Sequence, residues 1–206
     1  MEAIAIPVKP FGASKSRLAG YLGEDSRREL GLAMLREVLA AIRGWPLCLM
    51  VTADPVAAEV GMQMGCILIN DETDDLNSAI KVATRSAVER RASSLLVLPS
   101  DVPRVTREEI ATIFTSTAQV AVVESLDGGT NALLRRPPSA IETSFGPHSA
   151  AAHETASSNL SFEKLILPGL SRDVDSIDDI LWLAQQPGPS GDVARRISRE
   201  LEERVP

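Results

Sequence analysis

The sequence predicts an α/β fold of three layers, with helices on both faces of a mostly parallel sheet. Short apolar runs alternate with amphipathic segments of helical period over residues 3–123, which is the pattern of consecutive strand–helix units. The apolar runs are continuous, as expected for strands that are buried on both faces. Right-handed crossovers then place the carboxyl ends of these strands at one edge of the sheet, where ligands bind.

Each predicted element has a local signal. The apolar runs that predict strands are residues 3–6, 47–52, 66–69, 95–98 and 120–123. A capping-box pattern, Ser26 with Glu29, predicts the start of the first helix, which ends near Gly44. Pro55 takes the first helical position of the second helix, which ends at Gly65.

Polar caps also mark the later helices. Asp74 or Asp75 begins a helix that runs to about Arg91, and Thr106 with Glu109 begins a shorter one. After residue 123 the regular alternation ends. The elements predicted there are a turn at 127–131, strands at 132–135 and 162–167, and helices at 150–157 and 177–186.

We assign residues 1–186 to one domain and residues 187–206 to a linker and a C-terminal helix. The linker is the Pro- and Gly-containing stretch 187–191, and the charged helix spans about 192–204. This helix packs either on the surface of the domain or on a partner subunit, so a homodimer is one of the assemblies that we consider.

The composition limits the classes of partner. Lys plus Arg total 21 and Asp plus Glu total 28, giving a net charge of −7, which disfavours nucleic acid or an anionic membrane as a partner. No apolar run approaches the ~20 residues that span a bilayer, and no signal peptide is visible. Cys48 and Cys66 lie in apolar runs, which favours buried thiols over a disulfide or a metal site. We therefore expect a cytoplasmic protein with a small anionic ligand.

A cation-rich loop follows the first predicted strand. Residues 7–17 include Lys9, Lys15 and Arg17 and no acid. Loops at this place in α/β proteins hold phosphates with backbone N–H groups and cationic side chains. The glycines match neither a P-loop nor the dinucleotide-binding pattern, so phosphate binding here would use a different device. A solvated basic loop is the alternative.

Asp101 is the strongest candidate for a metal ligand, because it follows the buried run 95–98 and so lies at the ligand-binding edge. Mg²⁺ is held by one or two carboxylates together with substrate phosphates. Asp173 and Asp175, in a later loop between a strand and a helix, are candidates for the partner ligand. The alternative for each of the three is helix capping, where acids complement the helix dipole.

Two further loops contain small polar residues beside glycine. One includes Thr130 and Asn131, and the other includes Gly146 and Ser149. Such loops let backbone N–H groups approach an anionic substrate, and ordinary turn chemistry is the alternative. The two histidines, at positions 148 and 153, are five residues apart, which is the wrong spacing for a zinc-binding pair on one helix face.

Seven short motifs, taken in order, resemble one known family. They are PVK (7–9), SKSRL (14–18), DLNSAI (75–80), LPSDVP (98–103), GGTNAL (128–133), FGPHS (145–149) and DVD (173–175). In this order and spacing the chain resembles the 2-phospho-L-lactate guanylyltransferases, the CofC/FbiD family of deazaflavin coenzyme F-420 biosynthesis, over about residues 3–185.

The resemblance implies a nucleotide-diphospho-sugar transferase fold of the GT-A or MobA-like type, with a mixed, mostly parallel sheet. It also implies GTP, Mg²⁺ and a phosphorylated three-carbon acid, which is 2-phospho-L-lactate, phosphoenolpyruvate or 3-phosphoglycerate. The family's metal aspartate matches Asp101, and a later one falls at Asp173 or Asp175. The positions that bind the acid in this family fall at Thr130 or Asn131, Gly146 and Ser149.

On this basis we expect GMP transfer from GTP to the acid, with release of pyrophosphate. Lys9, Lys15 and Arg17 would bind the triphosphate, and Asp71 and Asn77 could face the nucleoside. Two alternatives stay open. One is another MobA-like nucleotidyltransferase with a different phosphorylated acceptor, and the other is a non-catalytic nucleotide-binding module.

Overall fold

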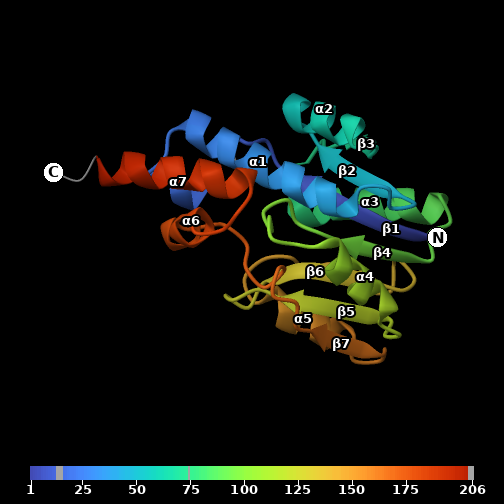
Figure 1. Cartoon of the computed structure of the whole chain (residues 1–206). Coiled ribbons are helices and arrows are strands. Elements are labelled where there is room, and N and C mark those ends of the chain that lie inside the picture. Colours follow the sequence, from blue (N-terminus) through green and yellow to red (C-terminus); the bar gives the residue numbers. More distant parts are fainter. Residues whose placement is uncertain (13–15, 74, 204–206) are drawn as a thin grey trace.

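The computed structural model describes residues 1–12, 16–73 and 75–203, and Figure 1 shows their helices and strands. Within this part of the chain, seven strands form one sheet in the order β3-β2-β1-β4-β6-β5-β7. β6 runs antiparallel to its neighbours β4 and β5, and every other pair is parallel. The predicted mixed, mostly parallel sheet is therefore confirmed.

Strands and helices alternate along the chain as far as β5. The strands are β1 (Glu2–Val8), β2 (Cys48–Thr52), β3 (Ile67–Asn70), β4 (Ser94–Val97), β5 (Val120–Glu124), β6 (Thr130–Arg135) and β7 (Phe162–Leu165). The helices are η1 (Ser16–Leu18), α1 (Glu24–Ile42), α2 (Pro55–Gln63), α3 (Leu76–Glu89), α4 (Arg107–Thr115), α5 (Ser149–Ala156), α6 (Ile177–Ala184) and α7 (Pro189–Glu202).

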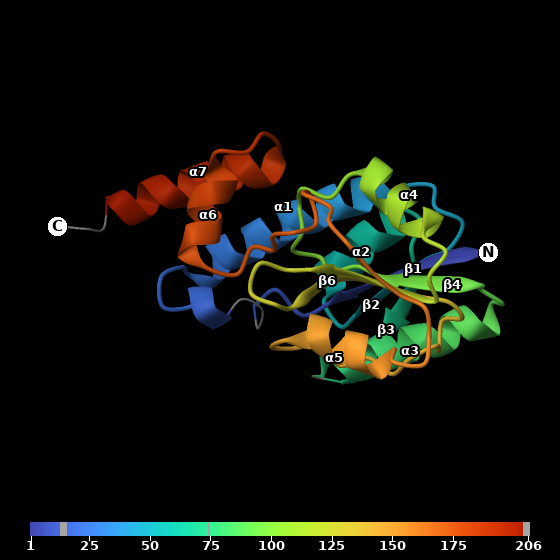
Figure 2. The ribbon, with the colours of Figure 1, turned by 90° about the horizontal axis from the view of Figure 1, so that it is seen from below.

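Helices cover both faces of the sheet, which gives the three predicted layers (Figure 2). α1, α2 and α4 pack on one face, over a core that includes Ile4 and Leu96. α3 and α5 pack on the other face, over residues such as Leu95 and Leu133. In the described part of the chain, no helix combines the length and the apolar character that a membrane span requires.

Side chains cap two of the helices as predicted, since Asp75 caps α3 and a capping box at Thr106 begins α4. A second capping box begins α6 at Ser176. The other candidate for the α3 cap, Asp74, lies outside the described residues. Cys48 and Cys66 are buried free thiols, which confirms the expectation for them.

α1 begins earlier than predicted. Its first residue is Glu24, and Gly23 precedes it without a side-chain cap. The capping box predicted at Ser26 and Glu29 is therefore wrong, because both residues lie inside the helix. The acids of the first turn, Glu24 and Asp25, favour the earlier start since they complement the positive end of the helix dipole.

α1 also connects the sheet to a second, smaller core. Its C-terminal half packs Leu35, Leu39 and Ile42 against the sheet. Its N-terminal half packs Leu30 and Met34 against α6 and α7. Figure 1 shows these two helices beside that half of α1, beyond the end of the sheet.

The C-terminal segment is more integrated than the sequence suggested. α7 begins at Pro189, inside the stretch predicted to be a linker, because proline fits the first turn of a helix. Val193, Ala194 and Ile197 of α7 are buried in the second core. The helix therefore packs on α1 and α6 of its own chain.

The topology brings several predicted site segments to one edge of the sheet. β1, β3, β4 and β7 point the same way, so the segments that follow them begin at that edge. Because β6 runs in the opposite direction, its first residues, Thr130 and Asn131, lie at the same edge. This edge is where parallel α/β sheets bind their ligands.

Candidate active site

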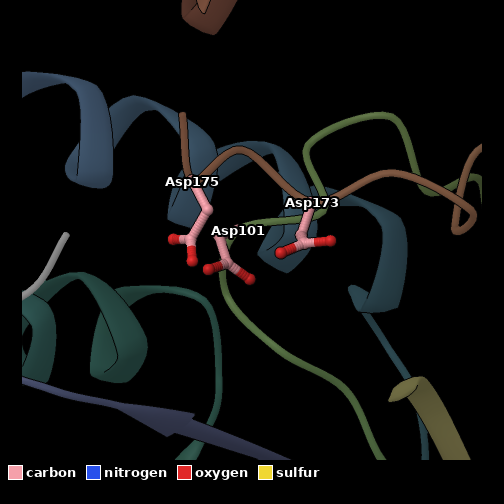
Figure 3. A group of neighbouring side chains, drawn as sticks. All are labelled: Asp101, Asp173 and Asp175. Carbon is pink, nitrogen blue, oxygen red and sulfur yellow. The ribbon is translucent and has the colours of Figure 1, made fainter. Parts of the chain in front are cut away.

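Three aspartates meet at this edge, as Figure 3 shows. One carboxylate oxygen from each of Asp101, Asp173 and Asp175 lies within 4.8 Å of the others, and the three side chains are half-buried. Asp101 comes from the loop after β4, and the other two come from the segment between β7 and α6. Like charges this close repel one another, and three carboxylate oxygens are the donors that a hard cation such as Mg²⁺ prefers.

A backbone contact joins the two loops that bear these carboxylates. The N–H group of Val174 donates to the carbonyl oxygen of Asp101 at 3.0 Å. Val174 is fully buried in the second core, so its neighbours Asp173 and Asp175 point the other way, toward Asp101. The carboxylate of Asp179 accepts from the N–H group of Asp175 at 3.2 Å and holds the end of this segment.

Burial and charge act together on Asp173. They raise the pKa of its carboxyl from 3.8 to about 6, with burial as the largest cause and the charge of Asp101 as the next. Asn131 acts in the opposite direction, because its side-chain N–H donates to Asp173 at 3.3 Å. A bound cation would stabilise the ionised form of Asp173. The residues at this position therefore fit a metal site.

A β-bulge explains why both Thr130 and Asn131 reach the site. Val123 pairs with Ala132, but Glu124 pairs with Thr130, so Asn131 is an extra residue in β6. Regular alternation would turn Thr130 to the same face as Ala132, which packs in the core beneath α1 and α4. The bulge instead turns Thr130 toward α5 and Asn131 toward the aspartates.

On the α5 side, Thr130 and Ser149 form a buried pair of hydroxyl groups whose oxygens are 2.9 Å apart. His153 lies beside them, with Nδ1 3.1 Å from Thr130 Oγ1 and with Nε2 accepting from the N–H group of Ser144 at 3.0 Å. This contact of His153 was not predicted from the sequence. The available signal was the spacing of four residues between Ser149 and His153, which puts both on one helix face.

Asn77 orders the loop that contains Gly146. Its side-chain amide donates to the carbonyl oxygen of Phe145 at 3.1 Å and accepts from the N–H group of Phe145 at 2.8 Å. Gly146 has a φ of 146°, a conformation that favours glycine, and the position of a Cβ atom there is open space. The sequence placed Asn77 toward the nucleoside, but in the structure both groups of its amide bind this loop.

The cations of the loop at residues 7–17 are the next group of predicted site residues. A guanidinium nitrogen of Arg17 is 3.6 Å from the carboxylate of Asp175, so the loop adjoins the acidic cluster. Lys9 lies near the start of α3. Its charge is a minor contributor to the lowered pKa of Asp75, after the hydrogen bonds of that carboxyl at the helix start. Lys15 lies outside the described residues.

Phe11 anchors this loop, a contact that was not predicted from the sequence. Its N–H group donates to the buried carboxylate of Asp54 at 3.1 Å. Its ring packs against Gly31 of α1, where a Cβ atom would come within 2.7 Å of the ring. A glycine in the middle of a predicted helix was the signal for such a close approach.

Asp71 lies apart from the acidic cluster. It follows β3, which β2 and β1 separate from β4 in the sheet. Its carboxylate accepts from the N–H and hydroxyl groups of Thr73, both at 2.9 Å, and so closes a turn. The structure thus brings the three aspartates, Asn131 and the hydroxyl pair together, and leaves Asp71 near the edge strand.

The fold is that of the nucleotidyl transferases. A protein of Desulfovibrio desulfuricans G20 described as a nucleotide-diphospho-sugar transferase has a TM-score of 0.79 and 16% identity, covering 98% of this chain and 97% of that one. A nucleotidyl transferase from Methanothermobacter thermautotrophicus has a TM-score of 0.68 and 15% identity, covering 95% and 99%. The fold implied by the motifs is therefore confirmed.

The chain belongs to the CofC-like guanylyl transferase family, whose profile matches residues 1–185. A phosphoenolpyruvate guanylyltransferase of Roseiflexus castenholzii is 35% identical over 200 residues, covering 95% of this chain and 93% of the relative. A 3-phospho-D-glycerate guanylyltransferase of Colwellia psychrerythraea is 28% identical, covering 90% and 92%. These similarities confirm the family that the motifs indicated.

Proposed function

We propose that this protein transfers GMP from GTP to a small phosphorylated three-carbon acid, with release of pyrophosphate, in coenzyme F-420 biosynthesis. The observation that carries the proposal is the cluster of Asp101, Asp173 and Asp175 between a basic loop and a buried pair of hydroxyl groups. Phosphoenolpyruvate is the first candidate acid, because relatives at 35% identity are named for it. 2-Phospho-L-lactate and 3-phosphoglycerate are the other candidates.

In this reaction a phosphate oxygen of the acid forms a bond to the α-phosphorus of GTP, and the bond to the β-phosphate breaks. The nucleophile is already anionic, so no general base is needed, and catalysis depends on positioning and charge. Lys9, Lys15 and Arg17 would bind the triphosphate and stabilise the charge that grows on pyrophosphate.

The acid would bind on the α5 side of the site. The hydroxyl pair of Thr130 and Ser149 would donate to an anionic oxygen of the acid, and the open backbone at Gly146 lets the ligand approach closely. Asn77 would act through the loop that it orders, and Asp71 would face the nucleoside.

The three aspartates would hold Mg²⁺. When bound, this ion supplies charge neutralisation for the phosphates that meet in the reaction. Asn131, through its hydrogen bond to Asp173, would keep that carboxylate turned toward the cluster.

We further propose that residues 1–186 form the catalytic domain and that residues 187–206 support it through α7. The proposed setting is the cytoplasm, because the substrates are GTP and a small metabolite. A homodimer is the assembly that a sizing experiment should test.

The direct test combines purified protein, GTP and Mg²⁺ with each of the three acids. We expect pyrophosphate release and a product whose mass equals that of the acid joined to GMP. GTP should be preferred over ATP, CTP and UTP, since a site built for one base leaves buried groups unpaired with another. Nucleotide binding without turnover would show a binding module, and equal rates with ATP would indicate a nucleotidyltransferase of another specificity.

A further inference from the structure

His153 is a buried ionisable side chain that the proposed chemistry does not yet use. It has no exposed surface, and its ring packs edge-on against Phe145 with centroids 5.1 Å apart. Its Nε2 atom lies 3.0 Å from the N–H group of Ser144, and a backbone N–H group can only donate. Nε2 must therefore accept, so in the neutral ring Nδ1 bears the proton.

This proton sets the direction of the hydrogen bonds beyond it. Nδ1–H donates to Thr130 Oγ1 at 3.1 Å, and this oxygen lies 2.9 Å from Ser149 Oγ. Two hydroxyl groups have two protons, and the contact between them uses one. Because His153 donates, it takes up neither of them, so one hydroxyl proton of the pair is left over.

The leftover proton has no acceptor within the protein, as far as the described residues show: the contacts of the pair are those with each other and with His153. Both hydroxyl-bearing side chains are more than nine-tenths buried, and an unsatisfied buried donor is costly. If Nδ1 accepted instead, both protons would be used and the pair would present only lone pairs, which repel an anion.

We propose that His153 is a positioning residue that keeps the Thr130–Ser149 pair as a hydrogen-bond donor toward an anionic oxygen of the acid. The proposal rests on the proposed function, because it takes the acid to bind at this pair. His153 acts through Thr130 and does not touch the acid itself.

The surroundings of His153 keep its ring neutral. Burial lowers its pKa to about 4, and the charge of Arg135 acts in the same direction. A second proton, on Nε2, would face the N–H group of Ser144 at hydrogen-bonding distance. Near pH 7 the fixed Nδ1–H form is therefore the one that the fold supports.

The first test reads the tautomer directly. Long-range ¹H–¹⁵N NMR spectra of the wild-type protein, labelled in histidine and recorded at pH 7, should show His153 as the neutral Nδ1–H form. A neutral Nε2–H form or a doubly protonated ring would overturn the proposal. This measurement needs no turnover and no variant.

The second test separates the two contacts of the ring. His153→Asn keeps an amide donor near the position of Nδ1, whereas His153→Gln reaches Ser144 but not Thr130. We expect KM for phosphoenolpyruvate to rise roughly fivefold to tenfold in the Gln variant and to stay within about twofold in the Asn variant, since one hydrogen bond is involved. KM for GTP should stay unchanged in both, and Glu154→Gln, an exposed neighbour on α5, is the control.

The reverse order of the two variants would overturn the proposal, because it would show that His153 serves only to hold Ser144. Equal melting-temperature losses without a change in KM for the acid would do the same. If wild-type protein transfers no GMP to any acid, the proposed function fails. The tautomer, and calorimetric titration of the same variants with phosphoenolpyruvate, still decide the role of His153.

Discussion

At the scale of single residues, the close approach of the carboxylates of Asp101, Asp173 and Asp175 is electrostatically unfavourable. Carboxylate oxygens within 4.8 Å of one another destabilise the protein when all are ionised, unless a cation lies between them. The bond between Val174 and Asp101 and the burial of Val174 hold the two loops together against this repulsion. The proposed binding of Mg²⁺ would account for this arrangement.

Asp101→Asn tests this explanation. The change keeps the shape of the side chain, removes one charged ligand, and should lower turnover by at least about a hundredfold, because a metal ion contributes several kcal/mol. Circular dichroism and thermal melts should show an intact fold. Asp178→Asn, an exposed acid in the first turn of α6, is the control, and near-normal rates for Asp101→Asn at ordinary Mg²⁺ would contradict the metal role.

The raised pKa of Asp173 predicts a dependence of stability on pH in metal-free protein. The folded state binds this proton more tightly than the unfolded chain, with a pKa of about 6 against 3.8. The contribution of Asp173 to the free energy of unfolding should therefore fall as pH rises from 4 to 7. Each unit of pKa difference corresponds to about 1.4 kcal/mol.

Asp173→Asn removes this titration and keeps an oxygen for the hydrogen bond from Asn131. In EDTA, urea unfolding at pH 4 to 7 should show the variant gaining stability over wild type as pH rises, by on the order of 2 kcal/mol. Other acids titrate in the same range, so the difference between the two proteins is the quantity to compare. A difference that does not change with pH would contradict the prediction.

Arg17 is the residue of the basic loop that lies 3.6 Å from Asp175 of the acidic cluster. If it binds the triphosphate, Arg17→Ala should weaken GTP use by roughly thirtyfold, the value of a desolvated charge-assisted contact of about 2 kcal/mol. The loss falls on kcat if the charge of Arg17 stabilises pyrophosphate as it leaves. It falls on KM if Arg17 binds GTP equally well in the ground state and in the transition state. We expect the same for Lys15→Ala.

The control is Arg28→Ala, which removes an exposed cation on α1. Unchanged GTP kinetics in both loop variants would mean that the loop is a solvated surface loop without a role in GTP binding.

At the scale of elements, apolar runs and cap residues predicted the order and type of the strands and helices. They did not predict that β6 inserts between β4 and β5, because strand order depends on contacts between distant segments. The alternatives Thr130 and Asn131 could not be separated for the same reason. Both reach the site through a bulge whose register is set by β5, and no local pattern in the sequence announces it.

The packing of Phe11 on α1 is a contact between elements that shapes the site. Gly31→Ala would place a Cβ atom 2.7 Å from the Phe11 ring, so the ring and the loop after β1 must shift. We expect KM for GTP to rise severalfold. The melting temperature should change little, because alanine stabilises a helix by about 1 kcal/mol relative to glycine and so offsets the strain at the ring. Gly20→Ala, where a Cβ atom meets nothing, is the control. Wild-type KM in Gly31→Ala would show that the loop position does not depend on this contact.

α1 contributes to two hydrophobic cores, one against the sheet and the smaller second core with α6 and α7, and the second core lies beneath the site. Val174, which lies between two of the clustered aspartates, is buried in this core together with Ile180 of α6 and Ile197 of α7. We therefore expect the C-terminal helix to help hold the carboxylates in position, although it lies beyond the family match at residues 1–185. From sequence alone, the charged exterior of this helix obscured its buried face.

Ile197→Ala tests the support that α7 gives to the site. The side chain is 1% exposed, and removing such a buried side chain costs about 2–5 kcal/mol, so we expect a clear fall in melting temperature. Because the second core positions Val174, the Mg²⁺ concentration for half-maximal activity should also rise severalfold below the melting range. Arg199→Ala, an exposed position on the same helix, should change neither quantity. If Ile197→Ala is less stable but keeps the wild-type Mg²⁺ dependence, α7 contributes to folding without positioning the aspartates.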